Sequence, residues 1–284
     1  MILVDWSNVS IACYLYAHGN IQKNPDESIV LPVVLSAFLD YKKKFLGHGE
    51  IALCVDSGET WRKDYFPLYK AKRKEKRDSD NFVDWNHLFE VNRNVYEDLI
   101  THMPFYGLKV PKTEADDIIA VMAKYLHPTE KVMIVASDKD FKQLQKFPNV
   151  RQYSTYTKDY LVEQDPDRFL LEHIIRGDGG DGIPNIKSPD NAFVDGIRQK
   201  SIFQKELNVW LNDTSLSFLT DDEMKARYQR NNKLINFNHI PQEIQDAILD
   251  HYQSYELGSK NIYKYFVARR LTNFMENIQE FSRK

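Results

Sequence analysis

Nine carboxylates stand beside apolar runs or in a glycine-rich stretch of this sequence. They are Asp5, Asp56, Glu114, Asp116, Asp117, Asp138, Asp140, Asp178 and Asp181. Three apolar runs end in an acid, "ILVD", "ALCVD" and "MIVASDKD", and a fourth begins directly after "TEADD". If the first three are parallel strands, their carboxyl ends meet at one edge of a sheet. The pattern therefore predicts a dense acidic cluster at that edge.

Such a cluster has a definite chemistry. Carboxylates packed closely raise one another's pKa and bind protons unless cations neutralise them. All of these side chains offer oxygen, and no His or Cys pair has the spacing of a zinc site. Oxygen donors favour Mg²⁺, for which Mn²⁺ can substitute. The acids suffice for two ions, an arrangement suited to in-line attack of water on a phosphodiester.

Each acidic group also has a purely structural explanation. Thr113 followed by Asp116 fits a helix capping box, and acids are favoured in the first turn of a helix. "SDKD" can be an N-cap with a first-turn acid, and "GDGGD" can be a loop. A structural origin for all groups at once is the weaker explanation. Because successive helical residues turn by about 100°, we expect Glu114 and Asp116 to contact metal directly and Asp117 to do so through water.

A basic segment follows the second acid-terminated run. Residues 62–77, "RKDYFPLYKAKRKEKR", carry eight Lys or Arg and two acids, a local charge of +6 in a chain of net charge −3. Aromatic residues are interleaved with these charges. Cations neutralise phosphates and aromatic faces stack on unpaired bases, which favours nucleic-acid binding over a merely solvated helix. We expect the segment to be mobile, because residues 70–77 repel one another and have little to pack on.

The elements that must position these residues alternate between strands and helices over the first 160 residues. Strands are predicted at residues 1–4, 51–55, about 108–110 and 132–136, with one or two edge strands in 149–163. Helices are predicted at 29–45, 84–103, from "TEADD" onward, at 141–147 and at 165–176. The alternation indicates an α/β domain with a mostly parallel sheet at residues 1–164 and an arch at about 61–83. Residues 165–284 are predicted to form a helical C-terminal region.

Composition excludes several classes of protein. The chain has 284 residues, 42% of them hydrophobic, which is enough for a substantial core. Its two cysteines, Cys13 and Cys54, stand in apolar surroundings and indicate buried free thiols in a reducing compartment. No apolar run has the length of a membrane span, and Asp5 interrupts the start of the chain, so neither a membrane protein nor a signal peptide is expected. We expect a soluble cytoplasmic protein.

The motifs "ILVDWSN", "LCVDSGETWRKDYFPLYKAKR", "TEADD", "ASDKDF" and "RGDGGDGIPNI", in this order, resemble the flap endonuclease family of structure-specific 5′ nucleases. They span about residues 1–187, and the T-even bacteriophage branch called ribonuclease H is the most similar. The resemblance implies a PIN-like fold with a helix–turn–helix DNA-binding element in the helical C-terminal region. It also implies a divalent-metal-dependent 5′–3′ exonuclease and flap endonuclease that hydrolyses RNA primers and DNA at single-strand/duplex junctions during replication.

The same resemblance gives roles to individual residues. Around the first metal it places Asp5, Asp56, Glu114, Asp116, Asp117 and Asp138, and around the second Asp140, Asp178 and Asp181. Catalytic roles fall on Arg62, Lys70 and Asp138, with Lys70 stabilising charge at the scissile phosphate. Predicted nucleic-acid contacts are Arg62, Phe66, Tyr69, Lys70, Lys72, Arg73 and Lys187, and Phe66 or Tyr69 would stack on a base. A monovalent cation is implied near Gly177–Ile186.

The sequence departs from the family pattern after Ile186. "NIKSPDNAF" replaces a second glycine-containing turn of the kind "GxGxKTA", and Gly182 stands where Asn is usual. The implied partners are branched DNA and RNA/DNA duplexes with 5′ ends, a single-stranded DNA-binding protein and a sliding clamp. Met1 lies only four residues before Asp5, which leaves no N-terminal tail for a clamp, so "ENIQEFSRK" is the candidate contact. A monomer in the host cytoplasm is expected.

Two other functions fit part of the sequence. A PIN-type ribonuclease shares the clustered acids but should lack the arch and the helical C-terminal region. A non-catalytic branched-DNA-binding module should have lost at least one acid, and all nine are present.

Overall fold

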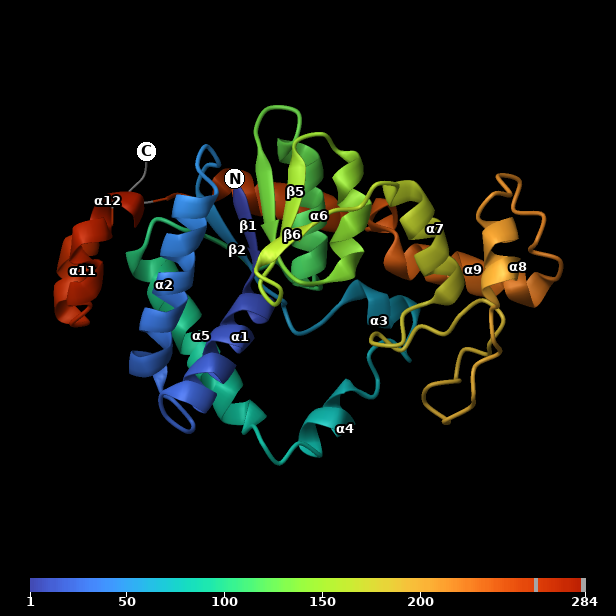
Figure 1. The fold of residues 1–284 in the computed structure, drawn as a ribbon, viewed down its shortest axis with the longest axis horizontal. Coiled ribbons are helices and arrows are strands. Elements are labelled where there is room, and N and C mark those ends of the chain that lie inside the picture. The colour runs from blue at the N-terminus through green and yellow to red at the C-terminus, as the bar shows by residue number, and fades with distance from the viewer. Residues whose placement is uncertain (258–259, 282–284) are drawn as a thin grey trace.

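A six-stranded sheet in the order β3-β2-β1-β4-β5-β6 forms the centre of the computed structural model, which describes residues 1–257 and 260–281. Strands β1 to β5 are parallel and β6 is antiparallel to β5 (Figure 1). The strands are β1 Ile2–Asp5, β2 Ile51–Cys54, β3 Tyr106–Leu108, β4 Val132–Val135, β5 Val150–Ser154 and β6 Asp159–Leu161. The predicted mostly parallel α/β sheet is confirmed.

Strands β1, β2 and β4 are the apolar runs that precede acids in the sequence. β2 and β4 are buried along their whole length, as is β1 up to Asp5. Parallel strands require such runs because helices cover both faces of the sheet. In the register of these strands, Leu3 pairs with Ala52 on one side and Ile134 on the other. The acids after the three strands therefore share one edge.

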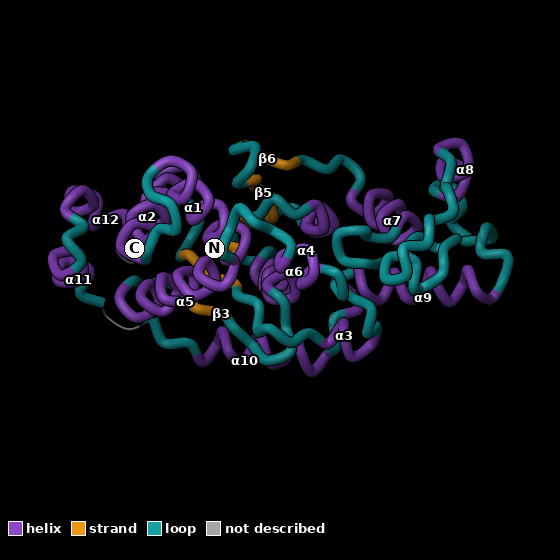
Figure 2. The backbone as a smooth tube through the Cα atoms, turned by 90° about the horizontal axis from the view of Figure 1, so that it is seen from below, coloured by secondary structure: helices purple, strands orange, loops and turns teal. Residues whose placement is uncertain are grey.

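Two layers of helices enclose the sheet. One layer holds α1 (Trp6–Asn20), α2 (Glu27–Lys44) and α5 (Trp85–His102), and the other holds α6 (Ala115–Leu126) and α10 (Gln242–Ser254). Figure 2 shows α1 and α2 on one side of the strands and α10 on the other. The end of the chain, α11 (Ile262–Ala268), the 3-10 helix η3 (Thr272–Asn277) and α12 (Ile278–Phe281), packs on the first layer.

The helical C-terminal region starts as predicted and then differs. Asp165 caps α7 (Pro166–Arg176), and α9 (Asp222–Ile235) packs beside it. The next helix after α7, α8, begins only at Gln204 and ends at Trp210, so just the first helix of the expected helix–turn–helix is formed. Backbone turns and side-chain contacts hold the loop 177–203. The backbone nitrogen of Asp195 donates to the carbonyl oxygen of Asn191 at 2.9 Å, and Ser188 Oγ accepts a hydrogen bond from the backbone nitrogen of Lys200 at 2.9 Å.

The arch contains two short helices, α3 (Trp61–Tyr65) and α4 (Arg73–Asp78). Figure 1 shows them between α9 and α5, with α4 at the lower margin of the molecule. The segment after β4 is the 3-10 helix η1 (Lys139–Lys146), and residues 237–239 form η2, a single 3-10 turn. Cys13 and Cys54 are buried free thiols, as predicted. Within the described part of the chain, no helix combines the length and the apolar character needed to cross a membrane.

Candidate active site

One cleft at the carboxyl edge of the sheet gathers acids from four elements. It has a volume of about 510 Å³, and its lining includes Asp5, Asp56, Asp116, Asp138, Lys70 and Arg73. The acids also fix the local backbone. Asp5 caps α1, Asp138 caps η1, and Asp56 accepts a hydrogen bond at 2.8 Å from the backbone nitrogen of Ala115, where α6 begins. These hydrogen bonds from the first turns of α1, η1 and α6 therefore hold the three carboxylates in place at the strand ends.

The electrostatics of this cleft suit cations. Burial raises the pKa of Asp5 to about 7, and the neighbouring charges of Asp56 and Asp138 contribute to the rise. Burial, followed by the charge of Asp138, raises the pKa of Asp116 well above its usual range. Carboxylates that repel one another in this way, with oxygen as the donor atom throughout, fit a hard divalent cation.

Helix α6 begins one residue later than predicted. Its N-cap is Glu114 rather than Thr113, and Asp117 completes the capping box by accepting a hydrogen bond from the backbone nitrogen of Glu114 at 3.1 Å. Thr113 instead donates its hydroxyl hydrogen to the carbonyl oxygen of Val110 at 2.7 Å. Asp117 thus closes the capping box inside the protein, whereas Asp116 lines the cleft.

Asp117 has no exposed surface and is bound by the arch. Its carboxylate lies 2.8 Å from Nη1 of Arg62 and accepts a hydrogen bond from Nε1 of Trp61 at 3.2 Å. Arg62, only 3% exposed, also lies 3.0 Å from Glu114 and donates to the carbonyl oxygen of Leu234 at 2.9 Å. Arg62 and Asp117 thus form the buried foot of the arch, and their contacts with DNA and metal stay predictions.

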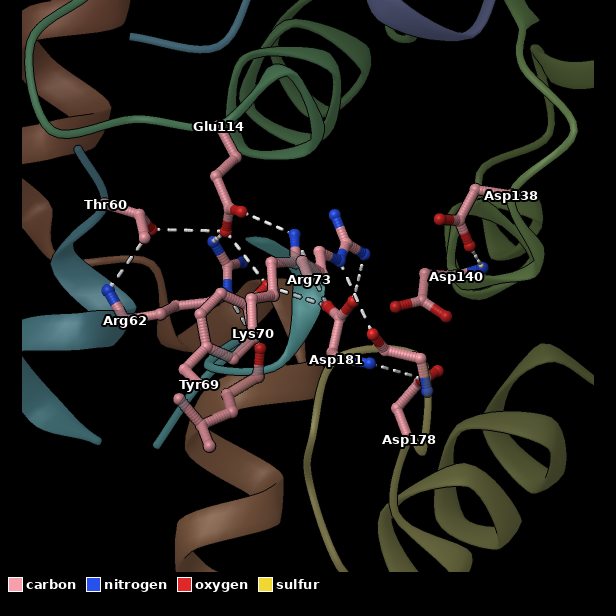
Figure 3. Close-up of polar contacts among 12 residues, drawn as sticks. Thr60, Arg62, Tyr69, Lys70, Arg73, Glu114, Asp138, Asp140, Asp178 and Asp181 are labelled. Carbon is pink, nitrogen blue, oxygen red and sulfur yellow. Dashed lines mark hydrogen bonds and ion pairs between the residues drawn. The ribbon is translucent and has the colours of Figure 1, made fainter. Parts of the chain in front are cut away.

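Glu114 is the meeting point of α6 and the arch (Figure 3). Lys70 Nζ lies 2.5 Å from Oε1 of Glu114, while the hydroxyls of Tyr69 and Thr60 donate to Oε2 at 3.0 and 3.2 Å. Burial disfavours the ionised form of Glu114, but the charges of Lys70 and Arg62 outweigh it and lower its pKa. Glu114 is therefore a carboxylate already neutralised by the arch.

A second group of acids, Asp140 on η1 with Asp178 and Asp181 on the loop after α7, lies beside Asp138 (Figure 3). Burial, followed by the charge of Asp138, raises the pKa of Asp140 to about 7. Asp181 accepts hydrogen bonds from the Tyr69 hydroxyl at 2.7 Å and from Nη2 of Arg73 at 2.5 Å. The arch thus binds both acidic groups.

The loop that carries Asp178 and Asp181 is a closed turn. Asp178 and Ile183 exchange two backbone hydrogen bonds, of 2.8 and 2.7 Å. Gly177 has a φ of +70°, and a Cβ there would lie 2.3 Å from the carbonyl oxygen of Ile183, so only glycine fits. The monovalent cation expected near Gly177–Ile186 stays a prediction.

Sequence reasoning missed His173, which lies on α7 between Asp140 and Asp178 and is 5% exposed. Its Nε2 is 3.0 Å from Asp178 Oδ2, and its Nδ1 is 3.4 Å from Asp140 Oδ1. Burial opposes ionisation of Asp178, but His173 and Lys139 outweigh it and lower its pKa. The available signal was the position of His173 on the buried stripe of α7, next to Ile174.

The predicted nucleic-acid contacts differ in exposure. Phe66 and Tyr69 are 6% and 2% exposed, so neither ring offers a free face to a base in this structure. Lys187 Nζ is paired with Glu206 at 3.0 Å. Lys72 is exposed, and Arg73 keeps 48% of its side chain in solvent. The expectation that residues 70–77 have little to pack on is wrong for Lys70 and Arg73, because Glu114 and Asp181 bind them.

Comparison with protein families agrees with this geometry. Residues 1–170 match the 5′-3′ exonuclease N-terminal resolvase-like domain, and residues 165–281 match the T4 RNase H C-terminal domain. The chain is a 5′-3′ exonuclease family member. The resemblance expected from the motifs is confirmed, and this 5′ nuclease belongs to a family of enzymes that hydrolyse phosphodiester bonds.

Individual relatives cover most of the chain. Ribonuclease H of Enterobacteria phage T4 is 32% identical to this 5′ nuclease over 292 residues, which is 98% of the chain and 95% of the relative. The flap endonuclease Xni of Shewanella piezotolerans is 27% identical over 177 residues, 59% of the chain and 64% of the relative. A bacteriophage T5 flap endonuclease, solved as a pseudo-enzyme-product complex with DNA and metal ions, has the same fold, with a TM-score of 0.64 at 16% identity over 89% of this chain and 97% of that one.

Proposed function

We propose that this 5′ nuclease is a divalent-metal-dependent 5′–3′ exonuclease and flap endonuclease that removes RNA primers and adjoining DNA during replication. The observation that carries the proposal is the meeting of two acidic groups beside Asp138, directly under a basic arch bound to both. The names of its relatives, ribonuclease H and flap endonuclease, support the same activity. Its substrates are branched DNA and RNA/DNA duplexes with 5′ ends.

Two Mg²⁺ ions, replaceable by Mn²⁺, fit the donors. The first would be held by the acids of the cleft, Asp5, Asp56, Asp116 and Asp138, and the second by Asp140, Asp178 and Asp181. The raised pKa values of Asp5 and Asp140 support this placement, because a bound cation stabilises the ionised carboxylates that burial, and after it the neighbouring acids, disfavour. When bound, such ions lower the pKa of the attacking water and stabilise charge on the phosphate and the leaving oxygen.

The arch supplies positively charged side chains that can bind phosphates beside the acids. Lys70 lies at the cleft between Glu114 and Asp181, at 2.5 and 3.5 Å, so its ammonium group can stabilise negative charge developing on a phosphate. Arg73 and Lys72 extend this positive surface along the arch and would neutralise neighbouring phosphates. Stacking of a base on Phe66 or Tyr69 requires those rings to leave their present packing.

The proposed setting is a replication complex in the host cytoplasm, where a monomer would work beside a single-stranded DNA-binding protein. A sliding clamp is the less supported partner. Its candidate contact, "ENIQEFSRK", includes Phe281, which is fully buried against the body of the protein. Residues 282–284 of that peptide lie outside the described residues.

The alternatives are less consistent with these observations. A PIN-type ribonuclease would not need the arch or the region that matches the T4 RNase H C-terminal domain. A module that only binds branched DNA would not need to retain all nine acids.

Cleavage of labelled substrates tests the proposal. We expect a 5′-flap duplex and an RNA/DNA hybrid to be cut near the junction with Mg²⁺ or Mn²⁺, to leave 5′ phosphates, and to survive in EDTA. Binding of the flap duplex without cleavage in either metal would support the binding module instead. Metal-dependent cutting of single-stranded RNA far from any 5′ end would support the PIN-type ribonuclease.

A further inference from the structure

We propose that His173 is a direct ligand of a divalent cation that it shares with Asp140, so that one of the two metal positions includes nitrogen and prefers Mn²⁺ or Co²⁺ to Mg²⁺. The inference deepens the proposed function and rests on it for the presence of a divalent cation. It adds a residue and a metal preference that the acids alone do not imply.

Two buried atoms with no hydrogen-bond partner face each other at this position. Nδ1 of His173 lies 3.4 Å from Oδ1 of Asp140, within ion-pair range. Neither atom takes part in a hydrogen bond, although both are inaccessible to solvent. Buried polar atoms are nearly always satisfied, so an atom without a partner points to a missing cation or water. If the imidazole hydrogen is on Nε2, both of these atoms have a lone pair available to a cation.

The other side of the imidazole is fixed in the way that suits a metal ligand. Nε2 of His173 lies 3.0 Å from Asp178 Oδ2, so a hydrogen on Nε2 is donated to that carboxylate. Asp178 is itself held by Nζ of Lys139 at 2.9 Å and by the backbone nitrogen of Gly180 at 2.8 Å. Metal-binding histidines commonly donate their second ring N–H to a carboxylate, which orients the ring and leaves the first nitrogen free to bind the ion.

The spacing agrees with this interpretation. Two neighbouring ligands bound to one ion at about 2.1 Å lie about 3 Å apart, close to the 3.4 Å between His173 and Asp140. Across the described residues, Asp140, His173 and Asp178 are the only group of at least three candidate ligands with ligand atoms within 4.8 Å of one another. Their burial pattern places the histidine inside and the acids at the rim.

A nitrogen ligand changes which metals bind best. Mg²⁺ is bound almost wholly by oxygen, whereas imidazole suits first-row transition metals, with affinity increasing from Mn²⁺ through Co²⁺. The competing explanation is that a doubly protonated His173 neutralises Asp140 and Asp178 without touching a metal. In that case bound Mn²⁺ would show no magnetic coupling to a histidine nitrogen.

Electron spin echo spectroscopy of Mn²⁺ bound to the full-length protein separates the two explanations without any variant. We expect modulation from a directly coordinated ¹⁴N nucleus, which changes when histidine alone is labelled with ¹⁵N. Tight Mn²⁺ binding without that modulation would overturn the inference. The proposed function would survive that result if the same protein still cut a flap duplex in Mg²⁺, whereas absence of divalent-cation binding would sink both.

Calorimetric titration of His173→Asn gives an independent measurement. We expect Mn²⁺ affinity at one site to fall at least about tenfold, as for loss of a ligand or its orienting partner, while Mg²⁺ affinity changes less than about threefold. His239→Asn, at an exposed histidine, is the matched control and should leave both affinities unchanged. Equal losses for the two metals, or no loss for Mn²⁺, would contradict the metal preference. Circular dichroism in EDTA checks the fold of each variant.

Discussion

Arg62 occupies a position expected to bind DNA, yet its guanidinium group is bound within the protein. It forms ion pairs with Asp117 and Glu114 and donates a hydrogen bond to the carbonyl oxygen of Leu234, and Arg62 is only 3% exposed. Removing one partner of a buried ion pair leaves the other charge without compensation, which costs about 3–5 kcal/mol. We therefore expect Arg62→Ala to lower the free energy of unfolding in urea by about that amount.

The neighbouring Lys63 is exposed on the same short helix and provides the control. Lys63→Ala should change the free energy of unfolding by less than about 0.5 kcal/mol. An Arg62→Ala protein with unchanged stability and weakened DNA binding would show instead that Arg62 acts mainly on the substrate.

The acids of the cleft predict an unusual dependence of stability on pH. The pKa values of Asp5 and Asp140 are raised to about 7, against about 3.9 in an unfolded chain. Between those values the native state binds more protons than the unfolded state, so stability falls as pH rises from about 4 to about 7 and stays low above it. The lowered pKa of Asp178 acts only at acidic pH.

In EDTA we therefore expect a lower Tm at about pH 8 than at about pH 5.5, and a larger rise in Tm on adding Mg²⁺ at about pH 8. Scanning calorimetry measures both. A protein with both Asp5→Asn and Asp140→Asn should show a flatter profile. Stability in EDTA that increases over this pH range would mean that these carboxyls are ionised without metal.

At the residue scale, the sequence was sufficient to predict which acids lie together at the sheet edge. It was not sufficient to predict the direction of every carboxylate. Apolar runs that end in Asp5, Asp56 and Asp138 were sufficient, because parallel strands present their ends at one edge. The orientation of Asp117 depends on Arg62, which approaches from a segment distant in the sequence and could not be placed beforehand. His173 was missed because a single buried histidine in a helix usually has only a packing role.

At the scale of elements, the loop after α7 determines where Asp178 and Asp181 lie. We expect Gly177→Ala to reduce cleavage at least about tenfold and to destabilise the protein by more than about 1 kcal/mol. The cause is the added Cβ, which would lie 2.3 Å from the carbonyl oxygen of Ile183. Flap cleavage rates and urea unfolding measure the two effects.

Gly196→Ala is the control that separates the steric clash at Gly177 from the strain of a positive φ. Gly196 has a similar φ of +67°, but a Cβ there meets nothing within 4 Å. It should therefore carry only the cost of the left-handed conformation and retain its activity. Equal effects of the two substitutions would mean that close packing of the loop is unimportant.

The elements differ in how well sequence predicts them. The strands and most helices followed from apolar periodicity and acidic caps. Helix α1 was not foreseen, because "WSNVSIACYLYAHGN" mixes polar and apolar residues without a clear stripe and only Asp5 marks its start. The second helix of the expected helix–turn–helix was predicted from the family pattern, and this chain departs from that pattern in the same place.

At the scale of the whole molecule, the C-terminal segment packs on the first helical layer rather than extending from it. Phe281 is fully buried and contacts Phe266 and Phe274, within the cluster that contains β1 and α2. Truncating a buried Phe to Ala costs about 3–5 kcal/mol. We expect Phe281→Ala to lower the free energy of unfolding of the entire protein by that amount in a single transition.

Val267→Ala, at a residue of α11 that is 51% exposed, should have little effect and is the control. Two separate unfolding transitions, with Phe281→Ala shifting only one of them, would indicate that the C-terminal residues fold independently.

The central claim is that the acids meeting beside Asp138 perform metal-dependent hydrolysis. Its most direct test is the single-turnover cleavage rate of a 5′-flap duplex by Asp138→Asn in Mg²⁺, with flap affinity measured in Ca²⁺ and with the exposed Asp159→Asn as control. We predict a rate at least about a hundredfold lower for Asp138→Asn, since a central metal ligand is removed, with flap affinity within about threefold of wild type and Asp159→Asn unchanged. A fully active Asp138→Asn protein would contradict the account.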